Sequence, residues 1–289
     1  MAKLIHLSDL HLVSPGTLTS RVLDTNAILE ETINEIANKI EYFGQIDALV
    51  VTGDISDDGS LESYISAYEK LGKLNVPVLA IPGNHDLRIP MRKIFHEDVE
   101  FSTSSTQFDW AFQHEETLII GLDTLVEGEN FGLLEKESLD FLSNHLSNYQ
   151  GSDLVLLIHH PPIKTGIYFM DQIGLKNSSD LSECLKSSNN PVKILCGHVH
   201  GVYHGLLGIH PVVTAPSVCS AFEFNRKKTA PVGFNKGPTG YAYFETSTDG
   251  FWTAIPSNYG SGPLKFSDGS EINTQAKFLS LIHISEPTR

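Results

Sequence analysis

The sequence predicts an α/β fold built from two mixed β-sheets that pack together and are flanked by helices. Up to about residue 200, strand-like apolar runs alternate with amphipathic stretches, which is typical of helix-bearing crossovers. Beyond that point short strands follow one another, which indicates hairpins. In addition, five of the early apolar runs end in Asp, Asn or His, and open α/β sheets place their ligands at the carboxyl ends of the strands.

The expected strands are short apolar runs bounded by polar or turn-forming residues. In the first part of the chain they cover residues 4–7, 47–52, 76–81, 154–158 and 192–195. A hairpin that turns at Glu115 and Glu116 is expected from residues 107–114 and 117–122. After residue 200 the expected strands cover residues 201–207, 210–214, 220–224, 241–246 and 251–255.

Helical periodicity is clearest in residues 24–42, where Ile28, Ile33, Ile36 and Ile40 recur at spacings near 3.6 residues. Further helices are expected over residues 61–74 and 133–146 and around residues 181–186. Residues 88–105 show only weak patterning and are expected to form a lid-like surface region. The stretch that leads to Gly174 is expected to be a loop.

The composition is typical of a soluble enzyme. A chain of 289 residues can bury a large core as one domain, and no apolar run approaches the ~20 residues that a membrane span needs. The formal net charge of -15 argues against a face for polymeric nucleic acid, because duplex binding depends on many Lys and Arg contacts to phosphate. It does not argue against a small anionic substrate, because bound cations dominate the field at a metal site.

The domain is expected to span residues 1–256, because the periodicity stops beyond Pro256. Residues 257–289 are expected to form a C-terminal tail, and it stays open whether its last ten residues belong to the native fold. Three scattered cysteines are too few for a disulfide framework, so reduced thiols are expected. Met1 stands eight residues before Asp9, which leaves no room for a cleaved signal peptide. We therefore expect a cytoplasmic location.

Five short motifs follow the early strands and carry the candidate ligands. They are Asp9-Leu10-His11, Gly53-Asp54 with Asp57, Gly83-Asn84-His85-Asp86, His159-His160-Pro161-Pro162 and Gly197-His198-Val199-His200. The paired side chains in the first and last motifs stand two residues apart, so an extended backbone would turn both members the same way.

The donor set indicates transition metals. Carboxylate, amide and imidazole groups without thiolate fit Mn, Fe, Co or Zn, and fit Ca or structural zinc poorly. The candidates are also too many for one tetrahedral zinc. They suit two metals roughly 3.5–4 Å apart, the arrangement that holds the attacking and leaving oxygens of a phosphoryl displacement. The two oxygens of Asp54 are suited to bridging such a pair.

Over residues 3–200 this ordered set of motifs resembles the calcineurin-like metallophosphoesterases. The resemblance implies a four-layer αββα sandwich with a dinuclear metal centre. It also implies one metal held by Asp9, His11 and His200, another held by Asn84, His159 and His198, and a bridge formed by Asp54. His85 would contact the substrate phosphate or protonate the leaving group, and Asp57 and Asp86 would support the ligands.

Within that family the chain resembles the branch of class III cyclic nucleotide phosphodiesterases and glycerophosphodiesterases, through residues 8–12, the His-His-Pro-Pro form and residues 214–219. The resemblance implies a metal-dependent phosphoric diester hydrolase. A metal-bound hydroxide would convert a 3′,5′-cyclic nucleotide, with cyclic AMP the first choice, to the nucleoside 5′-monophosphate.

Other functions remain open at this point: hydrolysis of glycerophosphodiesters, of phosphomonoesters or of nucleic acid, and a non-catalytic scaffold. The acidic charge disfavours a nuclease. A scaffold is disfavoured because every ligand position is filled.

Three residue assignments also stay open. His160 competes with His159 as the ligand, although the family pattern favours His159. His204 lines the site or is an ordinary strand residue, whereas His210 is expected to be structural. Phe222 and Phe224 either stack a nucleobase or pack in the core, with packing favoured.

Overall fold

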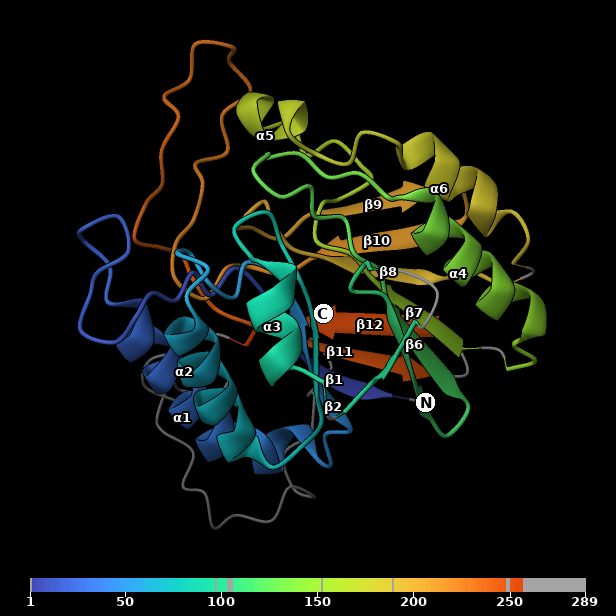
Figure 1. The fold of residues 1–289 in the computed structure, drawn as a ribbon, viewed down its shortest axis with the longest axis horizontal. Helices are drawn as coiled ribbons and strands as arrows, with labels where there is room; N and C mark the ends of the chain where they lie inside the picture. Colours follow the sequence, from blue (N-terminus) through green and yellow to red (C-terminus); the bar gives the residue numbers. More distant parts are fainter. Residues whose placement is uncertain are drawn as a thin grey trace, which may run out of the picture. The chain divides into compact units, whose positions relative to one another are not determined.

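A computed structural model describes residues 2–256 apart from 97, 103–105, 152, 189 and 248–249 (Figure 1). Five described strands form the first sheet in the order β12-β11-β1-β2-β3. The strands β1, β2 and β3 are parallel, β11 is antiparallel to β1, and β12 is antiparallel to β11. Their bounds are Lys3–Leu7 for β1, Ala48–Thr52 for β2, Val78–Ile81 for β3, Ala242–Ser247 for β11 and Gly250–Ala254 for β12.

Seven described strands form the second sheet in the order β4-β5-β6-β7-β8-β10-β9. Its centre, β6-β7-β8-β10, is parallel, and the remaining strands pair antiparallel at the two edges. The bounds are Glu100–Phe101 for β4, Trp110–His114 for β5, Thr117–Gly121 for β6, Asp153–Leu157 for β7, Lys193–Cys196 for β8, His204–Leu207 for β9 and His210–Thr214 for β10. Both sheets are therefore mixed, as predicted.

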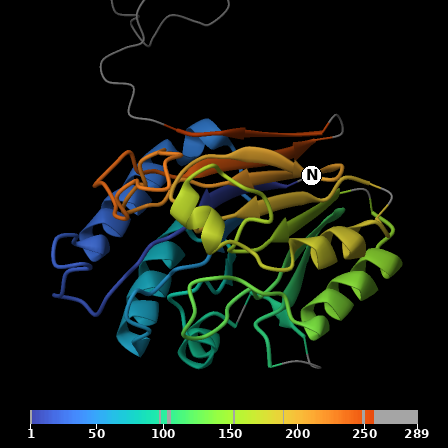
Figure 2. The same cartoon turned by 90° about the horizontal axis from the view of Figure 1, so that it is seen from above.

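Helices cover the outer face of each sheet, which gives four layers (Figures 1 and 2). The helices α1, α2 and α3 and the short 3-10 helix η1 accompany the first sheet, whereas α4 and α6 accompany the second. The short helix α5 packs in a separate small cluster with Val199 and Phe222. Their bounds are Thr25–Phe43 for α1, Leu61–Leu71 for α2, Gly72–Leu74 for η1, Arg88–Ile94 for α3, Lys136–Asn148 for α4, Tyr168–Gln172 for α5 and Ser178–Leu185 for α6. The predicted four-layer αββα sandwich is confirmed.

The core explains the apolar patterns. Helix α1 begins after Asp24, whose side chain accepts a hydrogen bond from the backbone N–H of Ala27, and it buries Leu29, Ile33 and Ile36. Strand β2 is buried along its whole length, because one of its faces meets the helices and the other meets the second sheet. This is why its sequence is a continuous apolar run without alternation.

Two segments differ from the sequence prediction. Residues 88–105 contain the short helix α3 and the strand β4, not an unpatterned surface region. Helix α3 is held by tertiary packing, since Met91 is fully buried and Phe95, directly after the helix, lies edge to face with Tyr68 at a ring distance of 5.4 Å. Such contacts override a weak local pattern. Helix α5 likewise replaces part of the expected loop before Gly174.

The strand expected over residues 220–224 is wrong. This segment makes only an isolated bridge, between Ala221 and Asn235. Its alternating side chains turn to the site described below, where Ser220 and Phe222 contact one imidazole ring. The predicted tail, residues 257–289, lies outside the described residues, so the boundary at residue 256 stays a prediction.

Candidate metal centre

The five motifs converge because each follows the carboxyl end of a parallel strand. The loops after β1, β2 and β3 belong to the first sheet, and those after β7 and β8 belong to the second. Backbone hydrogen bonds continue beyond the strands, with Asp9 N donating to Gly53 O at 3.0 Å and Gly197 N donating to His159 O at 3.1 Å. The loops of each sheet therefore hold one another in register at the edge where the ligand candidates lie.

Five predicted ligands have a left-handed backbone. Their φ angles lie between 47° and 70°, and they are Asp9, His11, Asp54, His198 and His200. This corrects the prediction of an extended backbone in the two paired motifs. For residues with a Cβ the left-handed conformation costs about 1–2 kcal/mol each, so the surrounding contacts must stabilise it. Strain of this kind concentrates at functional sites.

The first cluster consists of Asp9, His11 and His200, which offer one ligand atom each within 4.8 Å of one another. The Nε2 atoms of His11 and His200 lie 3.1 Å apart, and Nε2 of His200 lies 3.3 Å from Oδ1 of Asp9. Burial would raise the pKa of Asp9, but the neighbouring His200 outweighs it and lowers the pKa to about 2. The carboxylate is therefore ionised, as a metal ligand must be.

The opposite ring nitrogens of this cluster are held by polar partners. His11 donates from Nδ1 to Oδ1 of Asp57 at 3.0 Å, and Nδ1 of His200 lies 2.9 Å from Oγ of Ser220. These contacts turn both Nε2 atoms toward the centre of the site. A fixed ring orientation of this kind is typical of metal-binding histidines.

The second cluster brings Asn84, His159 and His198 together. Nε2 of His159 lies 3.3 Å from Oδ1 of Asn84, and Nδ1 of His159 donates to the carbonyl oxygen of Thr52 at 2.7 Å. Nε2 of His198 is buried and has no hydrogen-bond partner among the described residues. Burial and the neighbouring His160 and His159 hold the pKa of His198 well below its usual range. It is therefore neutral, with a nitrogen lone pair available.

Asp54 lies between the two clusters. Its Oδ2 is 3.6 Å from Nε2 of His11 and 3.4 Å from Nε2 of His159. Burial would raise the pKa of Asp54, but His159, His85 and His11 outweigh it and hold the pKa well below its usual range. An ionised carboxylate in this place can reach a cation on either side. The bridging role of Asp54 stays a proposal.

Two glycines let the loops approach this closely. A Cβ at Gly83 would overlap Oδ1 of Asp54, and a Cβ at Gly197 would lie 2.6 Å from the carbonyl oxygen of Thr52. Contacts this short are not possible for a side-chain carbon. The glycine before Asn84 and the glycine before His198 are thus required by close approach to neighbouring loops.

His85 stands at the rim of the site with its side chain 40% exposed. Its Nδ1 donates to Oδ1 of Asp57 at 3.1 Å, the oxygen that also holds His11. Burial would lower the pKa of His85, but Asp54 and Asp57 outweigh it and raise the pKa to about 9. His85 is therefore charged at neutral pH in the metal-free protein, and a protonated imidazole at this place suits a group that contacts phosphate or donates a proton.

Asp86 supports the loops from behind the site. It is buried and accepts hydrogen bonds from the backbone N–H groups of Gly83, Ile55 and Ser56 at 2.8, 3.1 and 2.9 Å. Burial and the nearby Asp54 raise the pKa of Asp86 to about 6. These bonds join the loops after β2 and β3. They support the predicted auxiliary role of Asp86, which stays a proposal.

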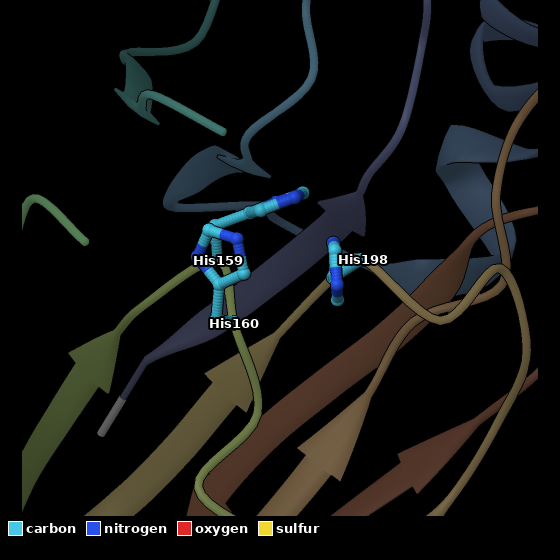
Figure 3. A group of neighbouring side chains, drawn as sticks. All are labelled: His159, His160 and His198. Atoms are coloured by element: carbon cyan, nitrogen blue, oxygen red, sulfur yellow. The ribbon is translucent and has the colours of Figure 1, made fainter. Parts of the chain in front are cut away.

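The choice between His159 and His160 is clarified by their partners. His159 points at Asn84 and Asp54, whereas Nδ1 of His160 lies 2.8 Å from Oγ1 of Thr124. Figure 3 shows these two side chains together with the neighbouring His198. The ring centroids of His159 and His160 lie 5.1 and 4.5 Å from that of His198. His160 also offers a ligand atom within 4.8 Å of those of His159 and His198, and its Nε2 is buried without a hydrogen-bond partner among the described residues. The contacts of His159 with Asn84 and Asp54 favour His159 as the ligand, and the choice stays a prediction.

The remaining histidines of the sequence analysis lie elsewhere. His204 is exposed on β9 and does not line the cavity at the site. His210 accepts a hydrogen bond from the backbone N–H of Val192 at Nδ1, which is a structural role.

Sequence reasoning missed the residues that orient the rings. Thr52 and Ser220 are such residues, and Ser217, whose Oγ donates to the carbonyl oxygen of Asp9 at 2.9 Å, braces the first motif. Small hydroxyl residues have no distinctive spacing. The one available sequence signal was the segment 214–219, which contains Ser217. We used it only as a mark of the resemblance to the cyclic nucleotide phosphodiesterase and glycerophosphodiesterase branch.

A cavity of about 390 Å³ opens on the centre. One side is formed by the ligand candidates and His85, and the other by apolar side chains. Ligand pockets in proteins have volumes of about 300–1,000 Å³, so this one can hold a small organic phosphate.

The family and the relatives that match this chain in sequence are phosphoesterases. A family model described as calcineurin-like phosphoesterase matches residues 2–202. A probable glycerophosphodiester phosphodiesterase of Arcobacter nitrofigilis is 32% identical over 238 residues, covering 81% of this chain and 85% of that protein. A probable cyclic nucleotide phosphodiesterase of Coxiella burnetii is 36% identical over 205 residues, covering 70% and 77%. A 3′,5′-cyclic adenosine monophosphate phosphodiesterase of Haemophilus influenzae is 28% identical over 221 residues, covering 76% and 78%.

Solved structures show the same fold at low sequence identity. A dimetal phosphatase from Danio rerio has a TM-score of 0.62 at 13% identity and covers 88% of this chain and 95% of its own. A purple acid phosphatase from yellow lupin, Lupinus luteus, has a TM-score of 0.59 at 15% identity, covering 88% and 49%. Among the described residues, no helix has the length and apolar character needed to cross a membrane.

Proposed function

Because the chain belongs to the calcineurin-like phosphoesterase family, we propose that it hydrolyses a small phosphodiester with two bound transition-metal ions. The leading substrate is 3′,5′-cyclic AMP, which would give AMP with a 5′-phosphate. The observation that supports this proposal best is the position of Asp54 between the two clusters, within 3.6 Å of His11 and 3.4 Å of His159.

The side chains fit two metal ions. The first site would use Asp9, His11 and His200, which offer ligand atoms within 4.8 Å of one another. The second would use Asn84, His159 and His198, and Asp54 would be shared. The buried Nε2 atoms of His198 and His160 both lack a hydrogen-bond partner among the described residues, and a buried nitrogen in that state costs free energy unless something binds it. The absence of thiolate from the set favours Mn, Fe, Co or Zn.

When bound, two such cations supply an activated water and neutralise charge on the phosphoryl oxygens. The chain supplies the remaining groups. His85 lies at the mouth of the centre, where in its protonated form it would contact the phosphate and donate its proton to the departing ribose oxygen. Asp57 holds His85 and His11 through one oxygen, which fixes the proton donor relative to the first site.

A small substrate fits the charge of the molecule better than a polymer. None of the cavity-lining residues, all of them described, is Lys or Arg, and the formal net charge is -15. A nucleic acid would need an extended basic track. Two of the relatives above are named for cyclic nucleotides and one for glycerophosphodiesters, so a glycerophosphodiester is the second candidate substrate.

A cytoplasmic location also remains a proposal. It is supported by the three cysteines, which are free thiols.

The test is a hydrolysis panel at matched Mn²⁺ and about 0.15 M salt, an ionic strength that screens non-specific binding to polymers. It compares cyclic AMP, cyclic GMP, 2′,3′-cyclic nucleotides, glycerophosphoethanolamine, bis(p-nitrophenyl) phosphate and DNA. We expect cyclic AMP to be turned over far faster than single-stranded or duplex DNA. Efficient degradation of DNA with cyclic nucleotides untouched would instead identify a nuclease. A preparation without stoichiometric Mn, Fe, Co or Zn, and without diesterase activity, would indicate a scaffold.

A further inference from the structure

The cavity at the metal centre has a second wall that the proposed chemistry does not use. This wall is apolar and is assembled from three parts of the chain: Leu23 before α1, the helix α5 with Phe169 and Met170, and the segment that carries Phe222 and Phe234. Figure 1 shows the long connection between β10 and β11, in orange, beside α5. Residues far apart in the sequence thus line the same cavity as the ligand candidates.

Aromatic rings make up the part of this wall next to the metal centre. The ring of Phe222 stacks on the imidazole of His200, with centroids 4.3 Å apart and planes at 26°. Phe169 meets Phe222 edge to face at 5.3 Å. Phe234 lines the cavity from the connection between β10 and β11 and is 37% exposed. We call Phe169, Phe222 and Phe234 the aromatic wall.

The charge around the cavity restricts what this wall can bind. No Lys or Arg is among the lining residues, all of which the structure describes, whereas Asp54 and Asp57 are. His85 would contact the phosphodiester at the metal centre, so a second phosphate on the ligand would have no Lys or Arg to contact. Against the aromatic rings the hydroxyls of a glycerol group would find no hydrogen-bond partner. The polar lining residues outside the aromatic wall include Thr19, Ser20 and Asn130. A flat, uncharged ring would instead gain contact with the aromatic side chains.

We propose that the aromatic wall binds the base of a cyclic purine nucleotide while its phosphodiester lies at the metal centre. The inference rests on the proposed function for the position of the phosphate. It adds the reason why a nucleoside phosphodiester is preferred to a glycerophosphodiester. The cavity volume of about 390 Å³ is sufficient for a single nucleotide.

The first experiment measures kcat/KM for cyclic AMP and for glycerophosphoethanolamine with Mn²⁺, and uses their ratio as the readout. Removing one aromatic partner of a base costs about 5- to 150-fold in binding. We expect Phe169→Ala and Phe234→Ala to lower the ratio by an amount in that range, chiefly through KM for cyclic AMP. Phe169→Leu keeps apolar volume without the ring, and should lower the ratio as well.

The matched control is Phe224→Ala. Phe224 belongs to the same connection but is 61% exposed and does not line the cavity. Its substitution should leave the ratio unchanged. Phe222→Ala is interpreted only together with metal content, because Phe222 also contacts His200. If the ratio is the same in wild type, Phe169→Ala and Phe234→Ala, the proposal that the aromatic wall binds the base is wrong.

A binding measurement separates this inference from the proposed reaction. The probe is the 3′,5′-cyclic monophosphate of 2-aminopurine riboside, whose fluorescence is quenched by stacking, added to Zn²⁺-loaded His85→Ala protein. Quenching that is weakened by Phe169→Ala supports the wall, and equal binding in both proteins rejects it. If wild type hydrolyses no diester, the proposed function fails and the probe alone decides. If wild type hydrolyses diesters but the substitutions change neither the kcat/KM ratio nor the quenching, only the proposal that the aromatic wall binds the base is rejected.

Discussion

Arg88 and Asp123 form a salt bridge that joins the two sheets. Arg88 donates from Nε and Nη2 to the two carboxylate oxygens of Asp123, at 2.6 and 3.2 Å. Arg88 follows β3 of the first sheet, four residues after Asn84, and Asp123 follows β6 of the second. The Asp123 side chain is fully buried and also accepts hydrogen bonds from the backbone N–H groups of Phe108 and Leu125. The loop that carries Asn84 and His85 is therefore fastened to the opposite sheet.

Asp123→Ala should destabilise the fold strongly. Removing one partner of a buried ion pair typically costs about 3–5 kcal/mol, because the remaining charge is left uncompensated. Here two backbone N–H groups also lose their acceptor. Urea unfolding of the metal-free protein measures the change. Glu35→Ala, which removes the partially exposed pair with Lys39, is the control and should change the free energy of unfolding by at most about 0.5 kcal/mol. Equal effects of the two substitutions would contradict the assigned role of Asp123.

Asp54→Ala should abolish diesterase activity and reduce the content of both metals, because one carboxylate reaches toward both clusters. Elemental analysis of the purified protein measures the metals, and circular dichroism checks that the variant is folded. Asp58→Ala is a suitable control, since Asp58 contacts Ser14, Ser56 and Ser60 and none of the ligand candidates. A folded Asp54→Ala protein with two metals and normal turnover would reject a shared ligand.

His85→Ala should keep its metals and lose rate. General acid–base catalysis typically contributes about 10²–10⁴-fold, and a loss of that order in kcat is expected for cyclic AMP. The loss should be smaller for bis(p-nitrophenyl) phosphate, because p-nitrophenolate leaves without needing a proton. A missing metal equivalent in His85→Ala would make His85 a ligand. An equal loss with both substrates would argue against proton donation.

Metal affinity should rise with pH. Burial opposes protonation of His159, but the nearby Asp54 outweighs it and raises the pKa of His159 to about 9 in the metal-free protein. The raised pKa means that the proton stabilises the metal-free fold fully below pH 6.5, and that this contribution is lost as the pH rises through about 9. A metal must displace that proton. Calorimetric titration with Mn²⁺ at pH 6.5, 7.5 and 8.5 should show tighter binding and less proton release as the pH increases. Affinity that does not change with pH would count against His159 as a ligand.

Removing residues 257–289 should leave the metal stoichiometry unchanged, because every motif ends by His200 and the last described strand, β12, ends at Ala254. Elemental analysis and size-exclusion chromatography of the truncated chain are the measurements. If the tail covers a sheet edge, its removal lowers the solubility of the protein, and this would not contradict the prediction. A monodisperse truncated protein that has lost its metals would place the domain boundary further along the chain.

Local sequence patterns were sufficient to predict most strands and the residues at their ends. Apolar runs such as Ala48–Thr52 are recognisable from the sequence alone because burial on both faces leaves no polar position. Asp54, Asn84 and His159 directly follow such runs. Parallel pairing of β2 and β3 brings Asp54 and Asn84 to one edge, whereas His159 follows β7 and joins them only because the two sheets pack together. Prediction failed where distant partners decide the structure. The helices α3 and α5 have too weak a local pattern to be predicted, and residues 220–224 alternate like a strand but direct their side chains to the site instead of joining a sheet.

The sequence by itself therefore determined the kind of chemistry, since residue types, their order and their place after strands are properties of the chain. Only the tertiary structure decided how that chemistry is held and what it faces. The left-handed backbone of His11 and His198 is sustained by contacts across sheets and loops, not by local preference. The hydrogen bond from Nδ1 of His159 to the carbonyl oxygen of Thr52 joins residues that are 107 positions apart in the sequence. The aromatic wall likewise exists only because α5 and the segment around Phe222 and Phe234 fold beside the same cavity, and no periodicity in one segment can encode a surface shared by several.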